Sequence, residues 1–400
     1  MQTTSIDTNR LHSGSLYKRP PGTHNATLTE VGQGTPMGEL LRRYWQPVAL
    51  ARDATTTPKL IRALGEELIL FRDKSGRPGL VHPRCAHRGT SLYYGKVEER
   101  GIRCCYHGWL FDVEGHCVEQ PCEPGGGAHR GKVRQPWYPV RDAYDLVFAY
   151  MGPPEKIPVL PRVDALEGAG PDQKILGEQK AFASGGPAIA DCNWLQYFEN
   201  ALDTFHVAVL HSNFSGLQFI PEMAVMPEVK WSLTAGGVKA TQHRQLDDGK
   251  LFLRVTEVLS PNVRSVPDAF GKKGPVDRIE WTLPVDDTHF TTFTAGVVAK
   301  DATVIRERRV LHNGKLWEDM TEEERRLFPD DREAQVGQGP ITLHSDEHLA
   351  TSDQGLVMFR RLLQRQLATV AEGKNPLGVW FNEAEAVIRL EAGNFFDAQL

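Results

Sequence analysis

The sequence contains 400 residues, which exceeds one ordinary domain core and predicts two or three domains. Its 46 basic and 51 acidic residues give a formal net charge of −5, without the basic balance of proteins that bind nucleic acids or anionic lipids. No apolar run approaches the roughly 18 residues that cross a membrane, and the N-terminus lacks the apolar centre of a signal peptide. We therefore expect a cytoplasmic protein with neither a membrane nor a nucleic-acid partner.

The first part of the chain changes from a polar segment to a β-rich domain. Residues 1–30 are rich in Thr and Ser and predict an N-terminal extension. Thr35-Pro36 is a helix start signal, and the apolar residues behind it recur at helical spacing: Met37, Leu40, Leu41, Tyr44 and Trp45. Short β-rich runs separated by Gly- and Pro-containing turns follow: Leu68–Arg72, Gly79–His82, Gly101–Cys105 and Val147–Met151. We predict a small all-β domain that, with its leading helix, covers residues 31–155.

The remaining residues, 156–400, predict a larger second domain. Residues 152–190 are rich in Pro and Gly and indicate a domain connection, and residues 191–217 favour helix followed by loop. Three β-rich blocks come next: Val229–Gln245, Leu251–Val266 and Val276–Lys300, the last with a hairpin turn at 284–289. Residues 315–336 are charged and predict a solvated helix with loops, whereas Asp353–Glu372 has one apolar face and predicts a closing amphipathic helix. The chain is therefore expected to be an α+β protein.

Four residues of the β-rich domain form a first candidate metal site. Cys85-Ala-His87 is followed, after 16 intervening residues, by Cys104-Cys-Tyr-His107, so two short turns each offer one thiolate and one imidazole. Clustered cysteines in a large chain without an export signal are more often metal ligands than disulfides. A tetrahedral zinc site would accept this set. The spacing better fits a Rieske [2Fe–2S] cluster, in which two imidazoles replace two thiolates on one iron and raise the potential to roughly −150 to +300 mV.

The residues that flank these ligands indicate the type of Rieske domain. Arg88-Gly89 follows the first pair and Gly108-Trp109-Leu-Phe111 the second, and RCAHRG with CCYHGWLF resembles the Rieske domain of ring-hydroxylating oxygenases. The respiratory-complex type carries an extra Cys in each loop, joined as a disulfide. Here Cys105 has no counterpart in the first loop, which favours the oxygenase type.

Residues 199–211 contain a second candidate site. Asp203, His206 and His211 form the pattern D-x2-H-x4-H. Electrons from a Rieske cluster need an acceptor, and two histidines with one carboxylate hold the Fe(II) of O₂-activating sites. Histidines five residues apart lie roughly 140° apart on an ideal α-helix. We therefore expect a π-type turn, or a helix end, between His206 and His211.

The third ligand of that iron must come from elsewhere in the chain. Three carboxylates are candidates, Asp346, Glu347 and Asp353. Asp353 begins the predicted C-terminal helix, so it would be held on a rigid element whose N-terminus favours the ionised form. The other two fall in a segment that we interpret as a charged loop. The predicted iron ligands are His206, His211 and Asp353.

Together these motifs resemble the α-subunits of Rieske non-haem iron aromatic ring-hydroxylating oxygenases, in the branch of phthalate dioxygenase. Gly34-Thr-Pro-Met-Gly38 and Arg42-Arg-Tyr-Trp-Gln-Pro47 are similar to the start of that branch. The resemblance covers about residues 30–155 and, locally, the two iron-ligand segments. It implies a Rieske domain beside a catalytic domain with an antiparallel sheet surrounded by helices. It also implies a [2Fe–2S] cluster, a mononuclear Fe(2+), and a homotrimer in which one subunit's cluster lies near its neighbour's iron.

The resemblance also implies roles for two acidic residues. Asp203 corresponds to a catalytic residue that connects a cluster ligand, here His107, to an iron ligand, here His206, across the subunit interface. A carboxylate that accepts hydrogen bonds from two imidazoles would orient both rings. Glu199 stands where the family often has Asn or another polar residue near the iron, and its role is open.

The expected reaction follows from the same resemblance. The sequence has no flavin or nicotinamide motif of its own, so a separate NAD(P)H-dependent reductase is implied. With those electrons and O₂, the chain would dihydroxylate or monooxygenate a small aromatic substrate, with aromatic acids or aryl ethers favoured. The alternative is a Rieske electron-transfer protein without oxygenase activity, which would not need the second ligand set.

The sequence gives two indications about the substrate pocket. Phthalate-type enzymes need cations to hold carboxylates, and the candidates, which could equally be solvated strand residues, are Lys230, Arg254 and Arg264. A cluster of apolar residues after the second motif indicates either a pocket wall or ordinary core: Phe214, Leu217, Phe219, Ile220 and Met223.

Overall fold

The computed structural model describes residue 16, residues 19–128 and residues 130–396. Most of the predicted extension, 1–30, lies outside these residues. Its last part is attached to the body of the protein, because helix α2 (Ala26–Thr29) buries Leu28 in the main core. Helix α3 (Pro36–Leu41) begins as predicted, with the Thr35 side chain accepting from the Gly38 amide. It ends earlier than predicted because Pro47 lies in the following segment, which forms strand β1 (Trp45–Leu50).

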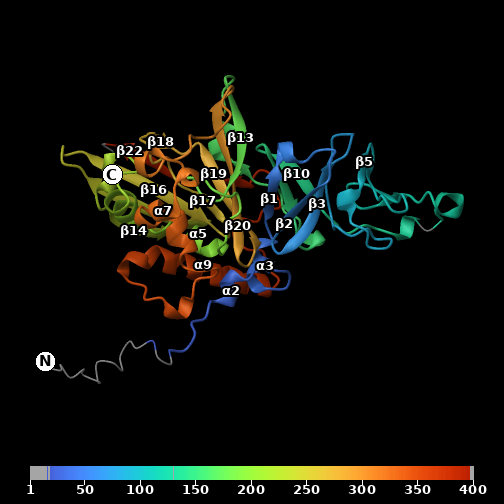
Figure 1. Cartoon of the computed structure of the whole chain (residues 1–400), viewed down its shortest axis with the longest axis horizontal. Helices are drawn as coiled ribbons and strands as arrows, with labels where there is room; N and C mark the ends of the chain where they lie inside the picture. The colour runs from blue at the N-terminus through green and yellow to red at the C-terminus, as the bar shows by residue number, and fades with distance from the viewer. Residues whose placement is uncertain (1–15, 17–18, 129, 397–400) are drawn as a thin grey trace.

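Three small antiparallel sheets form the first half of the molecule. The first contains β1, β11 (Leu146–Tyr150) and β10 (Val140–Ala143). The second contains β2 (Lys59–Ala63), β3 (Glu66–Arg72), β4 (Pro78–Val81) and β9 (Trp137–Tyr138). The third contains β5 (Lys96–Glu98), β6 (Gly101–Arg103), β7 (Leu110–Phe111) and β8 (Cys117–Glu119), and lies at one end of the molecule, on the right in Figure 1. Each of the four predicted strands is confirmed.

The second half is built on a nine-stranded antiparallel sheet. Its main path runs through β13 (Gln173–Lys180), β20 (His289–Ala299), β19 (Arg278–Asp286), β17 (Val263–Ser265), β16 (Leu251–Leu259), β15 (Gly237–Gln245) and β14 (Glu228–Leu233). Strands β18 (Gly274–Pro275) and β22 (Gly393–Phe396) extend it beside β16. The three predicted β-rich blocks and the hairpin between β19 and β20 are confirmed, whereas β13 falls in the segment predicted as a connection.

Helices cover this sheet and complete the predicted α+β fold (Figure 1). Helix α9 (Gln354–Ala371) is the predicted amphipathic helix, and it buries Phe359, Leu362 and Leu363 while packing against α3 and β15. The charged segment 315–336 contains α7 (Glu322–Leu327) and α8 (Asp331–Val336). Helix α7 has no buried residue, as expected of a solvated helix, but α8 buries Arg332 and Gln335. Among the described helices, none is both long enough and apolar enough to cross a bilayer.

Candidate metal centres

The first candidate centre lies in two loops next to the β5–β8 sheet. The loop with Cys85 follows β4, and the loop with Cys104 joins β6 to β7. Both have the same backbone arrangement, because the Gly89 amide donates to the Cys85 carbonyl (2.8 Å) and the Gly108 amide to the Cys104 carbonyl (3.1 Å). The two glycines have φ values of 76° and 71°, in the left-handed region that favours glycine. This backbone requirement explains why each loop has Gly four residues after its Cys.

The four predicted ligands of this centre lie together. The rings of His87 and His107 are 4.6 Å apart between centroids, and His87 stacks on Trp109 at 4.3 Å. Cys85 and Cys104 are buried, with 4% and 3% of their surface exposed. Burial, with a further contribution from the adjacent Cys104, raises the pKa of the Cys85 thiol to about 11. Two adjacent buried thiols beside two half-buried imidazoles fit a metal cluster, because bound iron would stabilise both thiolates.

The remaining cysteines do not form disulfides. All six cysteines lie in the described residues and are free, and Cys105 is exposed. No disulfide therefore joins the two cluster loops among the described residues.

The second candidate centre is built on an irregular helical segment. Helix α5 (Trp194–Glu199) precedes α6 (His206–Ala208), which continues directly into the π-helix η6 (Val209–Phe214). The predicted π-type turn is therefore confirmed. It places the His206 and His211 rings 5.3 Å apart between centroids, a pairing that five residues of ideal α-helix would prevent.

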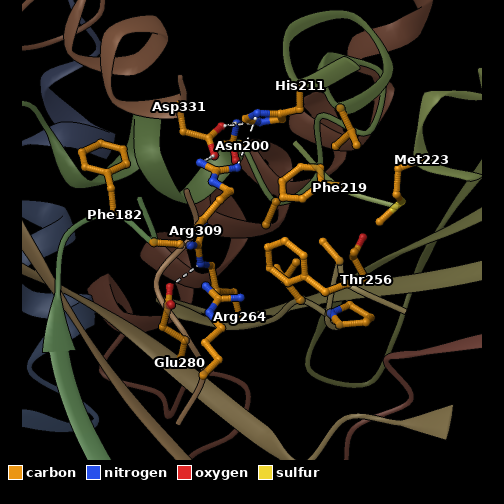
Figure 2. Close-up of a pocket in the computed structure, with 18 of the residues that line it drawn as sticks. Phe182, Asn200, His211, Phe219, Met223, Thr256, Arg264, Glu280, Arg309 and Asp331 are labelled. Carbon is orange, nitrogen blue, oxygen red and sulfur yellow. Dashed lines mark hydrogen bonds and ion pairs between the residues drawn. The ribbon is translucent and has the colours of Figure 1, made fainter. Parts of the chain in front are cut away.

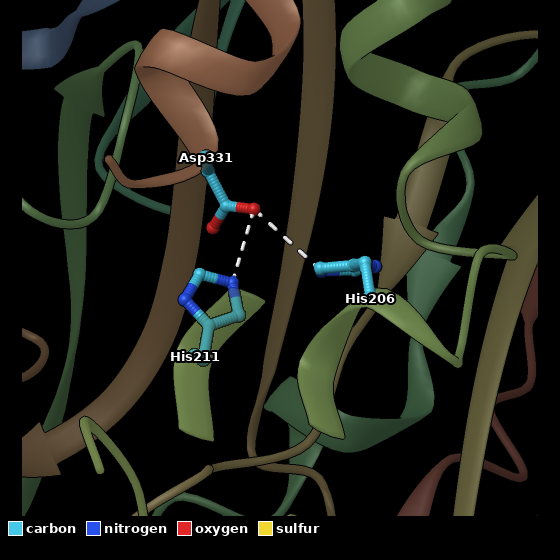
Figure 3. Close-up of side chains that lie close together, drawn as sticks. All are labelled: His206, His211 and Asp331. Atoms are coloured by element: carbon cyan, nitrogen blue, oxygen red, sulfur yellow. Dashed lines mark hydrogen bonds and ion pairs between the residues drawn. The ribbon is translucent and has the colours of Figure 1, made fainter. Parts of the chain in front are cut away.

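Hydrogen bonds at Nδ1 orient both imidazoles toward one point. His206 Nδ1 donates to the backbone carbonyl of Asp203 (2.5 Å), and His211 Nδ1 donates to Oε1 of Gln218 (2.8 Å). The Nε2 atoms of His206 and His211 lie 3.6 and 3.2 Å from Oδ1 of Asp331 (Figure 3). The ligand atoms of these three residues all lie within 4.8 Å of one another, which suits a metal ion held by two histidines and one carboxylate.

Asp331 therefore supplies the carboxylate that lies with His206 and His211, whereas the structure does not bring Asp353, the predicted third ligand, to these histidines. Asp353 does cap the start of α9, but its carboxylate accepts a hydrogen bond from the Ala350 amide (2.7 Å). Asp331 is the first residue of α8, the helix that the charge pattern had indicated to be solvated. Burial alone would raise the pKa of Asp331, but His211, Arg309 and His206 outweigh it and hold that pKa well below its usual range.

The other acidic candidates have different partners. Asp346 pairs with Arg19 (2.8 Å). Arg360, on α9, pairs with both Glu347 and Glu199, each at 2.5 Å. Burial nevertheless raises the pKa of Glu199, although hydrogen bonds from Arg360 oppose the shift. His206, His211 and Asp331 are called the metal group from here on. The polar residue beside this group is not Glu199 but the residue that follows it, Asn200, whose Nδ2 lies 3.3 Å from both His206 Nε2 and Asp331 Oδ1.

Asp203 lies beside His206 at the surface. Its side chain is 42% exposed, and one carboxylate oxygen is 3.7 Å from His206 Nδ1. Burial would lower the pKa of His206, but its hydrogen bond to the Asp203 carboxylate and the charge of Asp331 outweigh it and raise that pKa. An exposed carboxylate in contact with a candidate ligand leaves one side accessible to another molecule.

A cavity extends from the metal group toward the large sheet (Figure 2). His211 and Asp331 lie at one end, Arg264 and Glu280 lie at the other, and Phe182, Phe219 and Met223 lie on the walls between them. Of the five apolar residues predicted as a pocket wall, Phe219 and Met223 line the cavity. Ile220 packs with them in a small apolar cluster, whereas Phe214 and Leu217 are exposed.

Cationic side chains other than Arg309 also line this cavity. They are Lys180, Arg254, Arg264, Arg278 and Arg306. Arg264 is paired with Glu280, and Arg254 donates to the backbone carbonyls of Asp268 and Pro267. Arg306 forms no hydrogen bond or ion pair with any residue that the structure describes, and burial followed by repulsion from Arg278 lowers its pKa to about 10. Of the predicted cations, Arg254 and Arg264 line the cavity and Lys230 is exposed.

Comparison with known proteins identifies the class of protein to which this fold and these centres belong. Residues 44–139 match the family model of the Rieske [2Fe-2S] domain. The chain is 50% identical to phenoxybenzoate dioxygenase subunit alpha of Ectopseudomonas oleovorans over 389 residues, which cover 96% of this chain and 95% of that one. It is 30% identical to the phthalate 4,5-dioxygenase oxygenase subunit of Pseudomonas putida, over 88% of each chain. The solved structure of NdmB from Pseudomonas putida CBB5 has the same fold, with a TM-score of 0.60, 20% identity, and coverage of 87% of this chain and 95% of that one.

The chain therefore belongs to the oxygenase α-subunits of Rieske non-haem iron oxygenases, in the branch that contains phthalate dioxygenase. It is an oxidoreductase whose cofactors are a Rieske [2Fe–2S] cluster and a mononuclear iron. The similarity runs along the whole chain to oxygenase subunits, so it supports the oxygenase and not the alternative of an electron carrier.

Proposed function

We propose that this oxygenase acts on an aromatic carboxylate, and that an aryl-ether acid of the phenoxybenzoate type is its substrate. The observation that carries this proposal is the cavity, which has the metal group at one end, apolar walls, and the unpaired Arg306 among the residues that line it. A cation that is desolvated without a partner is costly, and a substrate carboxylate would supply the missing partner. The 50% identical relative is named for phenoxybenzoate, an aromatic ether that carries a carboxylate.

We assign the two cofactors to the two groups of residues described above. Cys85, His87, Cys104 and His107 hold the cluster, and His206, His211 and Asp331 hold the iron. When bound, the iron supplies O₂ activation. The chain's own residues keep the imidazoles in the orientation that metal binding requires and surround the substrate ring with Phe182, Phe219 and Met223.

The proposal includes a partner for the exposed Asp203. In a head-to-tail homotrimer, the Asp203 carboxylate would accept a hydrogen bond from His107 of the neighbouring subunit while it contacts His206 of its own chain. A separate NAD(P)H-dependent reductase would deliver the electrons, in the cytoplasm.

Product analysis tests the substrate. The purified chain, supplied with NADH, a reductase and isotope-labelled O₂, is given phenoxybenzoate or diphenyl ether, which lacks the carboxylate. We expect labelled product from phenoxybenzoate with a kcat/KM at least 10-fold above that of the neutral ether, because one charge-assisted hydrogen bond is worth about 1.5–3 kcal/mol. Two labelled oxygen atoms in the product would identify dioxygenation, and one would identify monooxygenation. Equal turnover of the acid and the neutral ether would contradict the proposal.

A pair of variants tests the role of Arg306. Arg306→Met should raise KM for phenoxybenzoate about 10- to 100-fold and leave KM for diphenyl ether nearly unchanged. Arg308→Met is the matched control, since Arg308 is half exposed and pairs with Glu318 on the surface. An equal effect of both variants would show that Arg306 does not hold the carboxylate.

A further inference from the structure

The two oxygens of the Asp331 carboxylate face different partners. Oδ1 lies toward His206 Nε2, His211 Nε2 and Asn200 Nδ2, at 3.6, 3.2 and 3.3 Å. Oδ2 accepts a hydrogen bond from Nη2 of Arg309, at 3.2 Å. Figure 3 shows that both imidazoles approach the same oxygen. One oxygen is thus directed at the metal group, and the other is already engaged by a guanidinium.

Arg309 is fixed by contacts that do not involve the metal group alone. It is 5% exposed, and its Nη2 atom donates to both oxygens of Asp330, at 2.5 Å each. Its guanidinium also lies 5.0 Å from the centre of the Phe219 ring, on the wall of the cavity. Asp330 is fully buried, and its backbone amide donates to Glu333 in the capping box of α8. Arg309 is therefore held by Asp330 and Phe219 whichever way the Asp331 carboxylate turns.

We infer that Arg309 is a positioning residue that makes Asp331 a one-oxygen ligand of the iron. This inference rests on the assignment of the iron to His206, His211 and Asp331. Turning the carboxylate so that both oxygens reach the metal would break the hydrogen bond from Arg309, which is 5% exposed, to Oδ2. A one-oxygen carboxylate and two imidazoles occupy three positions and leave the others for O₂ and substrate.

The pair of aspartates explains how an arginine can stand so close to a metal site. Asp330 and Asp331 carry two negative charges, and Arg309 balances one of them. One negative charge is thus left to attract the cation. Without Asp330, the guanidinium would compete with the metal for the Asp331 carboxylate.

The crystal structure of the wild-type holoenzyme tests the inference directly. We expect Oδ1 of Asp331 at bonding distance from the iron, about 2.0–2.2 Å, and Oδ2 outside the coordination shell and still bonded to Arg309. Two Asp331 oxygens at bonding distance would overturn the inference and leave the proposed function intact. Iron bound without any of His206, His211 and Asp331 would instead overturn the proposed ligand assignment.

Two variants separate positioning from general packing. In Arg309→Met, iron should remain at about one mononuclear ion per chain, both Asp331 oxygens should bind it, and kcat should fall about 10- to 100-fold. The changed coordination should also alter the EPR signal of the nitric oxide complex of the mononuclear iron. Arg332→Met is the control, because Arg332 is a buried arginine of α8 whose guanidinium donates to the Gly185 and Pro187 carbonyls and not to the Asp331 carboxylate. An unchanged EPR signal in Arg309→Met, or the same change in both variants, would contradict the inference.

Discussion

The two candidate metal centres differ in how the chain holds their histidines. In the cluster loops, the rings of His87 and His107 are half exposed, and neither ring forms a hydrogen bond with a residue that the structure describes. At the mononuclear centre, both rings are fixed through Nδ1, by the Asp203 carbonyl and by Gln218. His211 is 1% exposed, and a guanidinium holds the third member, Asp331.

This difference matches the two tasks that the family requires. The half-exposed imidazoles of His87 and His107 are accessible to a partner, as electron delivery requires. Fixed imidazoles and a fixed carboxylate at the end of a cavity keep ligand geometry constant while substrate enters and leaves. Neither ring nitrogen of His87 or His107 has a partner among the described residues, so each ring could bind iron through one nitrogen and present the other to a partner, whereas Nδ1 of His206 and of His211 is already used.

The largest effect on activity is expected when a buried thiol of the cluster loops is removed. In Cys104→Ser we expect loss of the cluster and of turnover, with iron falling from about three to about one per chain. Iron analysis and the visible absorption of the cluster measure this. Cys105→Ser is the matched control, because the neighbouring thiol is exposed and should be dispensable. A normal cluster spectrum in Cys104→Ser would show that the loop ligands are wrongly assigned.

The next largest effect should come from the connection between the two centres. Asp203→Asn should keep both metals but lower kcat by at least about 100-fold, since it removes the carboxylate beside His206. Rapid mixing of reduced enzyme with substrate and O₂ would follow reoxidation of the cluster, which should slow by the same factor. Near-normal reoxidation of the cluster in Asp203→Asn would contradict a bridging role of Asp203.

A smaller effect is expected when one ring of the mononuclear centre loses its support. Gln218→Ala removes the acceptor of His211 Nδ1, which should weaken iron binding or lower turnover about 10- to 100-fold. Iron titration of the apo-site and steady-state kinetics would measure this. If both remained at wild-type values, the contrast between fixed and free imidazoles would have no functional meaning.

The smallest effect, on thermal stability, concerns an ion pair between the two halves of the molecule. Arg62 on β2 pairs with Asp286 on β19 (2.7 Å). Burial would raise the pKa of Asp286, but hydrogen bonds from His289 and Thr288 outweigh it and lower that pKa. A lowered pKa means that the ionised form stabilises the fold, so this stability is present above the ordinary Asp value and lost as the pH falls through the folded value.

Asp286→Asn should therefore lower Tm by about 2–4 °C at pH 7, and the difference should be smaller at pH 3, below the ordinary Asp value of about 3.9. Scanning calorimetry at both values would measure it. Asp248→Asn, in the exposed turn between β15 and β16, is the control and should leave Tm unchanged. A difference that is the same at both pH values would not come from the charge of Asp286.

Local sequence determined what could be predicted about these centres. Each cluster loop contains its ligands, its glycine and its flanking strands within a few residues, so Cys85, His87, Cys104 and His107 could be found from spacing. The π-turn followed from the five-residue separation of His206 and His211. Strand β13 was missed because Gln173–Lys180 has no clear polar and apolar alternation.

The carboxylate was missed because its position depends on tertiary packing. Helix N-terminal placement favoured Asp353, but the same argument applies to Asp331, which begins α8. The path of the chain between β20 and α8 brings Asp331, which lies 120 residues after His211, to the histidines. The tandem Asp330-Asp331 was a usable signal, since two adjacent carboxylates at a buried helix start need cationic partners.

The central claim is that Asp331, and not Asp353, completes the mononuclear iron site. Iron content of Asp331→Ala and Asp353→Ala, purified with intact cluster absorption, tests it most directly. The structure predicts about two irons per chain in Asp331→Ala and about three in Asp353→Ala. Loss of the third iron in Asp353→Ala, with retention in Asp331→Ala, would contradict the account.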